Sequence, residues 1–376
     1  MKNTKDKIQI DALKALSGKR LAGIEISMGV GKTRIGLKHM AINYTAFSKY
    51  LVVAPKKVIF ESWKDEMEKI GYGYLAEHVE FSTYISLKKK DLDYDVVYLD
   101  ECHSLKANHN SWLLNFVKKG GAVVGMTGTY PVRVKSEKGK MCNFYCPKVY
   151  EYLIDDAVKD NVLNDYQIYV HPVTLSSKRN IERKGKHGTF NTSETKDYDY
   201  WTERLDKAKT LKEEHICRIQ RMKCLQKFKS KEDYAKLLLD DSDPKIKTIV
   251  FANEKVQADR LSEFSVHSSN SDSKANLEMF KTGEIMKCSA VQQLSEGVTI
   301  PELKEAIIMH SYSNNRQAAQ KIGRVLRLNP KDKAIVHILC YINTVDKEWV
   351  TNALSSFNKD KIVYLESPKY HGGVHY

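Results

Sequence analysis

The stretch LAGIEISMGVGKTR, residues 21–34, decides the fold. Its first half is an apolar run typical of a buried strand, and its second half is a glycine-rich turn leading into a helical pattern. Such a turn lets backbone N–H groups surround phosphates, with Lys32 reaching the outer phosphates and Thr33 offering its hydroxyl to magnesium. The full phosphate-loop pattern expects a glycine where this chain has Ile26, so a strand-to-helix turn with an incidental lysine stays an alternative.

The same alternation of apolar runs and helical segments recurs along the chain. The first half contains LAGIEI, YLVVAP, DVVYLD and AVVGMTG, and the second half contains KTIVFAN, IMKCSAV, EAIIMHS and AIVHILCYI. Strands that alternate with helical segments favour parallel sheets joined by crossover helices. We therefore predict an α/β fold with two domains, residues 1–150 and 245–376, each a mainly parallel sheet flanked by helices.

Residues 151–244 are predicted to link the two domains. Within them, residues 176–200 are polar, basic and almost free of aliphatic side chains, which is typical of a mobile loop or insertion. Residues 202–228 are predicted to be helical, with a strongly basic face. The part from 178 to 186 is a candidate clamp on nucleic acid, and a disordered solvated loop is the alternative.

The composition excludes several classes of protein. Of the 376 residues, 42% are apolar and 29% are charged, which is typical of a folded chain and not of a disordered one. The net charge of +14 favours contact with phosphate backbones, although solvated lysine faces also produce such an excess. No apolar run approaches the roughly 18 residues that span a bilayer. We predict no membrane partner and a cytoplasmic location, in the host cell if the chain is encoded by a phage.

Two adjacent acids end the run VVYLD, since Asp100 is followed by Glu101 in LDECH. Downstream of a phosphate loop, this arrangement places one carboxylate near magnesium and the next where it can activate water for attack on the terminal phosphate. A solvated strand end capped by acids is the alternative.

Two further segments carry side chains suited to the same chemistry. GMTGTYP supplies Thr127 and Thr129 after another buried run, where hydroxyls could hydrogen-bond to the acidic motif, and a simple turn would explain them equally well. In QKIGRVLR, Arg324 and Arg327 are three apart and share a face of a helix. Two guanidinium groups suit the charge on a transferred phosphoryl group, and a solvated basic helix is the alternative.

Together these segments resemble a superfamily 2 helicase or translocase, in the order that this family shows. The matching segments are IQIDALKAL, SMGVGKT, VVAPKKVIFESWKDEMEK, STYISL, LDECH, TGT, TIVFAN, QQLSEGVTIPEL and QKIGRVLR. ESWKDEMEK and DECHSLKAN resemble the chromatin-remodeller-like and phage repair-helicase-like branches. The resemblance implies two RecA-like P-loop domains with ATP and Mg²⁺ bound in the cleft between them.

The resemblance also implies roles for individual residues. The catalytic residues would be Lys32, Asp100, Glu101, Gln320, Arg324 and Arg327. The nucleotide would be bound by Gln9, Gly29, Gly31, Lys32, Thr33, Arg34 and Gly297, and magnesium by Thr33 and Asp100. Nucleic acid would be contacted by Pro55, Lys56, Thr83 and Tyr84, and hydrolysis would be coupled to movement through His103, Thr127 and Thr129.

The expected function is ATP-driven unwinding, branch migration or translocation on nucleic acid, with DNA favoured over RNA by the branch of the family. An RNA helicase of the same superfamily, a P-loop ATPase or phosphotransferase that does not move along a strand, and a nucleic-acid-binding protein without hydrolysis are the alternatives. Nothing in the sequence sets the oligomeric state, and a monomer is compatible with this prediction.

Overall fold

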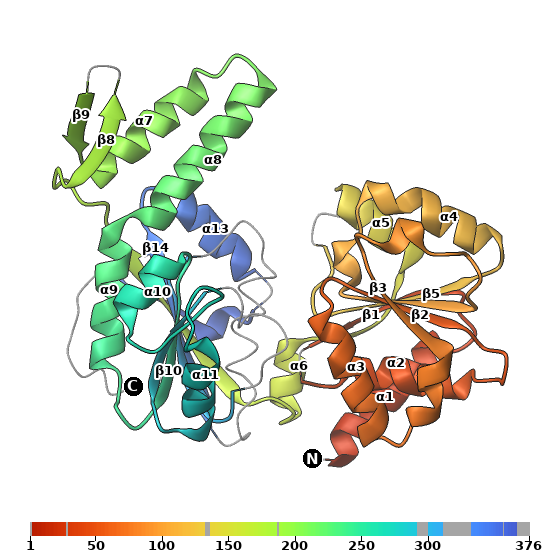
Figure 1. The fold of residues 1–376 in the computed structure, drawn as a ribbon. Coiled ribbons are helices and arrows are strands. Elements are labelled where there is room, and N and C mark those ends of the chain that lie inside the picture. Colours follow the sequence, from red (N-terminus) through yellow and green to blue (C-terminus); the bar gives the residue numbers. More distant parts are fainter. Residues whose placement is uncertain are drawn as a thin grey trace. The chain divides into compact units, whose positions relative to one another are not determined.

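The computed structural model describes residues 2–27, 29–131, 136–185, 188–291, 300–310, 332–355 and 357–366. The chain divides into two compact units, Met1–Leu163 and Asn164–Tyr376. Each unit is built around its own sheet (Figure 1), and neighbouring strands of both large sheets run parallel. The predicted α/β class is thereby confirmed. Among the described residues, no helix combines the length and apolar character needed to span a membrane.

The sheet of the first unit has six strands in the order β3-β2-β4-β5-β1-β6. These strands are β1 (Leu21–Ile26), β2 (Tyr50–Ala54), β3 (Val79–Thr83), β4 (Val96–Asp100), β5 (Ala122–Thr127) and β6 (Lys148–Tyr152). The helices are α1 (Lys2–Leu16), α2 (Lys32–Ile42), α3 (Val58–Lys69), α4 (Asn110–Lys118), α5 (Glu137–Tyr145) and α6 (Ile154–Lys159). Helices α4 and α5 cover one face, while α1, α2 and α3 cover the other (Figure 1).

Both faces of this sheet are buried, which explains why its central strands are apolar almost throughout. Every residue of β2 and β4 is buried. Alternate residues such as Leu51 and Leu99 pack with Phe116 of α4 in one apolar cluster. Because strands covered on both faces need apolar side chains on both, a run such as VVYLD can end in acids only where it leaves the core.

The sheet of the second unit has seven strands in the order β11-β12-β10-β13-β14-β7-β15. These are β7 (Asp165–Val173), β10 (Lys247–Phe251), β11 (Ser265–Val266), β12 (Lys287–Ala290), β13 (Leu303–Ile308), β14 (Lys333–Tyr341) and β15 (Ile362–Tyr364). The helices are α7 (Glu194–Asp206), α8 (Leu211–Lys227), α9 (Lys229–Asp241), α10 (Lys255–Leu261), α11 (Ser273–Thr282) and α13 (Val345–Ala353). All eight apolar runs named above lie on strands of the two sheets.

The segment 151–244, predicted as a linker, contributes to the second unit. Its strand β7 pairs with β14 over nine residues, from Asp165 beside Lys333 to Val173 beside Tyr341. The contacts divide the chain between Leu163 and Asn164, so this strand belongs to the second sheet. Sequence reasoning passed over β7 because the run DYQIYVHPV mixes polar and apolar residues.

Residues 176–200, predicted as a mobile loop, instead contain ordered elements. The strands β8 (Ile181–Gly185) and β9 (Gly188–Thr192) form an antiparallel hairpin, and α7 follows directly. Helix α7 begins where the Ser193 side chain accepts a hydrogen bond from the backbone of Lys196, as a good N-cap does. The low aliphatic content was misleading because an ion pair of Arg183 with Asp197 joins the hairpin to α7, and Ile181 packs against the apolar cluster of the second unit. The hairpin and these two helices project from the body of the unit (Figure 1).

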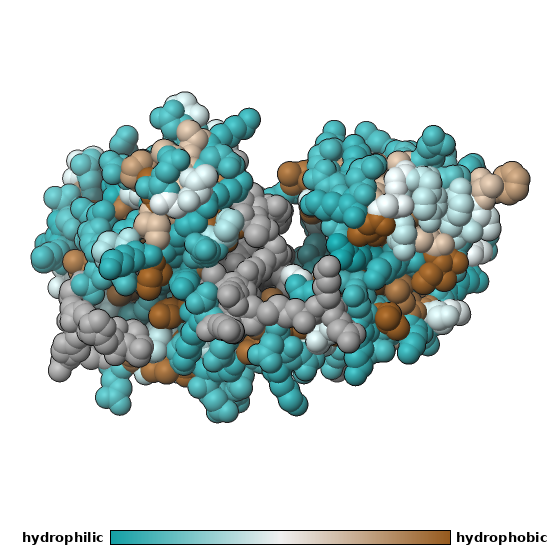
Figure 2. All heavy atoms as spheres, turned by 90° about the horizontal axis from the view of Figure 1, so that it is seen from below, coloured by the Kyte–Doolittle hydropathy of each residue, from teal (hydrophilic) through white to brown (hydrophobic). Residues whose placement is uncertain are grey.

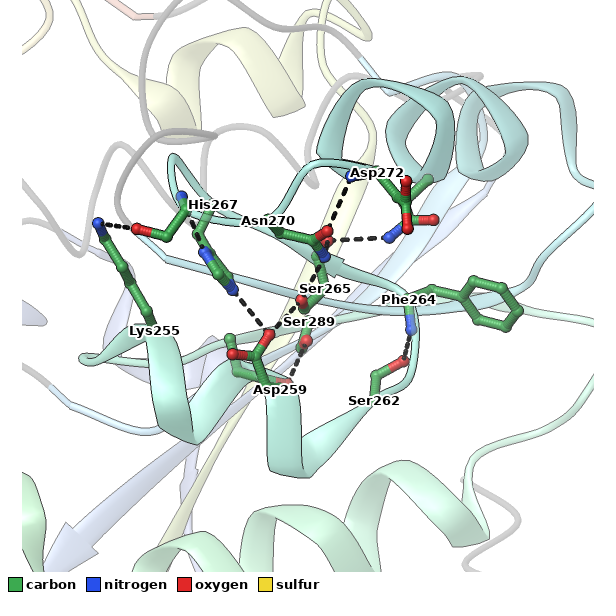
Figure 3. A network of polar contacts seen from close by, with 12 residues as sticks. Lys255, Asp259, Ser262, Phe264, Ser265, His267, Asn270, Asp272 and Ser289 are labelled. Carbon is green, nitrogen blue, oxygen red and sulfur yellow. Dashed lines mark hydrogen bonds and ion pairs between the residues drawn. The ribbon is translucent and has the colours of Figure 1, made fainter.

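A polar network fixes the turn between β11 and α11 at the edge of the second sheet (Figure 3). One oxygen of the Asp259 carboxylate accepts from Ser265 Oγ at 2.6 Å and lies 2.7 Å from His267 Nε2. These hydrogen bonds hold the pKa of Asp259 below its usual value. Asn270 Nδ2 donates to the Ser265 carbonyl at 2.9 Å, so the whole turn is tied to α10 and β11.

Candidate active site

The glycine-rich turn joins β1 to α2. Gly29 and Gly31 have φ of 87° and 101°, in the left-handed region that favours glycine, so this backbone path would strain other residues. Helix α2 begins at Lys32, and the positive end of its dipole therefore lies at the turn. The backbone is thus shaped to receive an anion.

Gln9 closes one side of this turn from helix α1. Its side chain is buried, Nε2 donates to the Val30 carbonyl at 3.0 Å, and Oε1 accepts from Lys38 Nζ at 2.8 Å. A side chain at Gly31 would crowd it, because a Cβ there would lie 3.1 Å from Gln9 Nε2. Gln9 thus lies against the glycine-rich turn, whose Gly29 and Gly31 are predicted to bind the nucleotide together with it.

Several polar groups of the turn point inward without a strong partner. Lys32 Nζ donates to the Ile26 carbonyl at 3.3 Å, a long contact that bends the ammonium back over its own strand. Ser27 Oγ is buried and has no hydrogen-bond partner among the described residues. Leaving such a group unpaired costs roughly 1–3 kcal/mol, so a ligand oxygen here would relieve it. Thr33, the second residue of α2, is half-buried beside them.

Arg34, predicted to bind the nucleotide, has a protein partner in the structure. Its Nε lies 2.6 Å from Glu66 Oε1 on α3, and a terminal nitrogen contacts the same oxygen at 2.6 Å. Both contacts pin α2 against α3. A nucleotide contact by Arg34 would have to compete with this ion pair.

Asp100 ends β4 with a buried carboxylate. Trp63 Nε1, from α3, donates to its Oδ2 at 2.9 Å. Burial, followed by the neighbouring charge of Glu101, raises the pKa of Asp100 to about 6, while the Trp63 hydrogen bond and the Lys32 charge act in the opposite direction. The carboxylate therefore lacks a full counter-charge and is suited to bind a cation.

Glu101 leaves the strand in a left-handed conformation, with φ of 51° and ψ of 55°. For a residue other than glycine this costs roughly 1–2 kcal/mol, so packing around the site must hold it. Its Oε2 lies 3.2 Å from Thr127 Oγ1 and 3.2 Å from His103 Nδ1. His103 Nδ1 also lies 2.7 Å from Thr127 Oγ1, and the backbone N–H of Thr129 donates to that hydroxyl at 3.1 Å.

The strand order explains why these groups meet. Strand β5 lies between β4 and β1, and the register sets Asp100 beside Met126 and Glu25 beside Thr127. In parallel strands the carboxyl ends share one edge, so the turn after β1, the acids after β4 and the threonines after β5 converge there. Three segments of the predicted site are therefore assembled by one sheet.

The residues predicted to contact nucleic acid lie at the carboxyl ends of β2 and β3, and they differ in exposure. Pro55 is half-buried and Lys56 is exposed directly after β2. Thr83 ends β3 and its hydroxyl donates to Ser86 Oγ at 3.3 Å. Tyr84, however, is buried, and its hydroxyl donates to the Asp100 carbonyl at 2.9 Å. Tyr84 therefore supports the backbone at Asp100, and it is not exposed for contact with a nucleic-acid strand.

One residue that sequence reasoning did not single out shapes the site. Trp63 supplies the only side-chain hydrogen bond to the Asp100 carboxylate among the described residues, and its ring passes over Gly36 of α2, where a Cβ would lie 2.6 Å from it. A tryptophan on an amphipathic helix is typical of core packing. Only its position against Asp100 reveals the second task.

Four predicted residues lie outside the described part of the chain, namely Gly297, Gln320, Arg324 and Arg327. They remain predictions, and the described site belongs to the first unit alone.

A cavity of about 920 Å³ lies at the opposite edge of the same sheet. Its lining includes Arg20, Val96 and Ala122, which stand at the amino ends of β1, β4 and β5, together with the exposed Phe47. None of the groups described above lines this cavity. Volume is therefore a poor guide to the chemistry of this unit.

The doubly covered parallel sheet, the glycine turn and the acids at its carboxyl edge define a P-loop nucleotide-binding unit. Residues 1–92 match the family model of the type III restriction enzyme res subunit, and residues 229–329 match that of the helicase conserved C-terminal domain. The chain belongs to the superfamily 2 helicases and translocases, whose members use ATP.

Individual relatives agree with this placement. The chain is 24% identical over 369 residues to the DNA 3'-5' translocase XPB2 of Sulfurisphaera tokodaii, an alignment that covers 89% of this chain and 82% of that protein. A fragment assigned as an HsdR subunit of a type I restriction enzyme from Vibrio vulnificus has a similar fold, with a TM-score of 0.61, 17% identity and coverage of 95% of this chain and 67% of that chain.

A second solved structure, the ATP-dependent type ISP restriction-modification enzyme LlaBIII bound to DNA, has a TM-score of 0.59 and 13% identity. The alignment covers 96% of this chain but only 31% of that larger chain. Both structural likenesses bear out the two-unit parallel-sheet fold, which is the RecA-like pair expected from the sequence.

Proposed function

We propose that this chain is a motor that uses Mg²⁺-ATP hydrolysis to translocate on DNA or to separate its strands. The observation that carries the proposal is the convergence of Lys32, Asp100 and Glu101 at one edge of the first sheet, where burial and the charge of Glu101 raise the pKa of Asp100. A fold that only needed stability would not leave a buried carboxylate in this state.

The residues at this edge fit a magnesium ion. Asp100 and Thr33 offer oxygen donors, which this hard cation prefers, and the unpaired Ser27 Oγ adds a buried polar atom nearby in sequence. Bound with ATP, the ion would neutralise charge on the phosphates. Lys32 would exchange its long contact with the Ile26 carbonyl for the outer phosphates, a stronger charge-assisted interaction.

Glu101 is placed to orient and deprotonate the attacking water. Its carboxylate is held by His103 and Thr127, and the strained backbone keeps it turned away from the line of β4. The resemblance assigns Arg324 and Arg327 to the charge on the transferred phosphoryl group, supplied when the nucleotide is enclosed. Their arrival would make hydrolysis depend on closure of the motor.

A change at the γ-phosphate would be passed on through the hydroxyl and imidazole behind Glu101. Thr127 contacts Glu101, His103 and the backbone at Thr129, so one side chain links the acids after β4 to the turn after β5. Small shifts of Glu101 on hydrolysis would therefore be felt at the end of the neighbouring strand. This makes His103, Thr127 and Thr129 positioning residues of the coupling path.

DNA is proposed as the track. The named relative is a DNA translocase, and the net charge of +14 suits a phosphate backbone. The face drawn in Figure 2 is largely hydrophilic over each unit, with apolar residues only in scattered spots. Lys56 and Thr83, at the ends of β2 and β3, are the proposed contacts of the first unit.

The test is steady-state ATP hydrolysis without nucleic acid and with single-stranded DNA, duplex DNA, branched DNA and single-stranded RNA. We expect one DNA form to stimulate hydrolysis strongly and Glu101→Gln to abolish the stimulated rate, because the general base is lost. Glu77→Gln, an exposed acid of the same unit, is the matched control. Stimulation by RNA alone would point to an RNA helicase. A rate that ignores every polymer would leave a P-loop ATPase that does not translocate.

A further inference from the structure

A second pocket lies within the segment 151–244 that was predicted as a linker. It opens between the hairpin β8–β9 and helices α7 and α8, with a volume of about 640 Å³. This volume falls within the range of about 300–1,000 Å³ that is usual for small-molecule sites. It is therefore large enough for one nucleotide. The pocket belongs wholly to the second unit and contains none of the nucleotide-binding residues of the first.

Aromatic side chains form part of its wall. Phe190 on β9 and Tyr200 on α7 line the pocket, and their side chains are both about half exposed, at 54% and 51%. Trp201, next to Tyr200, packs against the apolar cluster beneath and lines the pocket as well. Exposed aromatic faces beside a cavity are the surfaces on which unpaired bases stack.

Three lysines stand around the same pocket without counter-ions. Lys184, Lys196 and Lys223 are exposed, and none has an acidic partner within 4.0 Å among the described residues. Arg183 contrasts with them, because its Nε and one terminal nitrogen bind the buried carboxylate of Asp197. The ion pair builds a neutral floor, while the lysines leave an excess of positive charge at the rim.

The pocket is tied firmly to the core of the second unit. The Glu194 carboxylate, at the start of α7, accepts from the backbone N–H of Ser176 at 2.9 Å and of Ser230 at 3.0 Å. The Tyr198 hydroxyl accepts from the backbone N–H of Val345 at the start of α13, at 3.0 Å. A ligand held in the pocket would therefore move with the second unit.

We propose that this pocket binds an unpaired nucleotide of the strand on which the motor acts, with the base against Phe190 or Tyr200 and phosphates against Lys184, Lys196 and Lys223. The inference deepens the proposed function and rests on it. A duplex hides the faces of its bases, so aromatic walls add nothing to its binding, whereas single strands use both stacking and charge. The cationic rim argues for a polyanion over an apolar peptide.

Photo-cross-linking locates the contact in the intact protein. A single-stranded oligonucleotide carrying 5-bromodeoxyuridine is bound without ATP, irradiated and digested, and the cross-linked peptide is identified by mass spectrometry. We expect cross-links to Phe190, Tyr200 or Trp201. Cross-links that fall only in the first unit or between residues 247 and 310 would overturn the proposal.

Substitution of Phe190 tests stacking. Phe190→Ala should weaken binding of single-stranded DNA about 5- to 150-fold, the loss of 1–3 kcal/mol for one stacked base, and leave blunt duplex binding within about two-fold. Phe190→Tyr should retain the affinity and Phe190→Leu should not, because leucine is apolar but has no π face. Phe47→Ala, a 91% exposed phenylalanine of the first unit, is the control. Equal losses on both DNA forms, or retention by the leucine variant, would contradict stacking.

Salt dependence tests the lysines. Each of Lys184→Ala and Lys223→Ala should lower the slope of log affinity against log salt by about 0.7 for single strands, whereas Lys69→Ala at the exposed end of α3 should not change it. Failure here can be told apart from failure of the proposed function. If DNA stimulates hydrolysis while these variants bind like the parent, only the pocket proposal is wrong. If no polymer stimulates hydrolysis, the motor itself is in question.

Discussion

Two combinations of lysine and aspartate among the described residues are built in opposite ways. In the second unit, Lys231 and Asp346 are almost wholly buried and contact each other directly, and the same carboxylate oxygen accepts from the Tyr341 backbone at 2.8 Å. In the first unit, Lys32 turns to a carbonyl and Asp100 to an indole, and no ion pair joins these two described residues.

The difference separates a structural pair from a binding site. Lys231 and Asp346 in the second unit neutralise each other, so neither charge is left for a ligand. Their ion pair joins α9 to the end of β14 and to α13. In the first unit, Lys32 and Asp100 have weak or neutral partners, and burial together with the charge of Glu101 raises the pKa of Asp100 to about 6. A site poised for a nucleotide keeps its charges incompletely paired until the ligand arrives.

The largest expected effect concerns the candidate site of the first unit, where Glu101 follows Asp100. Glu101→Gln removes the proposed base while keeping the shape and the contact with Thr127, so ATP turnover should fall about 10²- to 10⁴-fold. Nucleotide affinity, measured by fluorescence with an ATP analogue, should change little. A variant that keeps more than a tenth of the parent turnover would remove Glu101 from this role.

Substitutions in the Lys231–Asp346 pair of the second unit should instead lower the free energy of unfolding. Asp346→Ala leaves the Lys231 ammonium buried without a partner, and breaking such a pair costs about 3–5 kcal/mol. Urea unfolding followed by tryptophan fluorescence measures the loss. Replacing both partners, as Lys231→Met with Asp346→Leu, should recover most of it, since no charge then stays buried. A single variant as stable as the parent would show that the pair holds little together.

Protonation of Asp100 gives the next effect. With its pKa raised to about 6, the ionised form that binds a cation is lost as pH falls through 6, so affinity for Mg²⁺-ATP should fall there. Trp63→Phe deletes a donor to the carboxylate and should move this fall to higher pH. Trp112→Phe, which loses a hydrogen bond to the Lys90 carbonyl instead, should leave the profile in place.

The same raised pKa predicts the sign of a stability change. Because the folded protein holds this proton more tightly than the unfolded chain, whose Asp titrates near 3.8, the stabilisation is complete below pH 3.8 and is lost as pH rises through about 6. In the ligand-free Asp100→Asn variant, the free energy of unfolding should lack this dependence on pH. If the variant shows the same pH dependence as the parent, other groups cause it.

The smallest expected effect is that of Thr127→Val. The change keeps the shape but removes the hydroxyl between Glu101 and His103, a loss of about 1 kcal/mol and hence about five-fold in DNA-stimulated turnover. Thr248→Val is the matched control, since that buried hydroxyl donates to Glu305 in the second unit at 3.0 Å. Equal loss in both variants would mean a general packing effect and not coupling.

How far the sequence could be used differs between these regions. The eight apolar runs, the glycine turn and the acid pair were visible because strand burial, left-handed turns and catalytic acids each demand particular residue types. The hairpin β8–β9 was not visible, because its residues are mostly polar and its contact with α7 rests on the ion pair of Arg183 with Asp197, a distant partner that local sequence does not reveal. Tyr84 was placed on the surface by analogy, whereas packing turned it under the acidic turn.

The sequence by itself determined that a strand leads through a glycine-rich turn into a helix within residues 21–34, and that Asp100 and Glu101 stand at the end of another strand, since these are local consequences of residue type. Only the tertiary structure decided that β5 stands between β4 and β1, that Trp63 reaches Asp100, and that Arg34 is held by Glu66. The reason is physical. Backbone preferences act between neighbours in the chain, whereas register and side-chain partners depend on how distant segments pack.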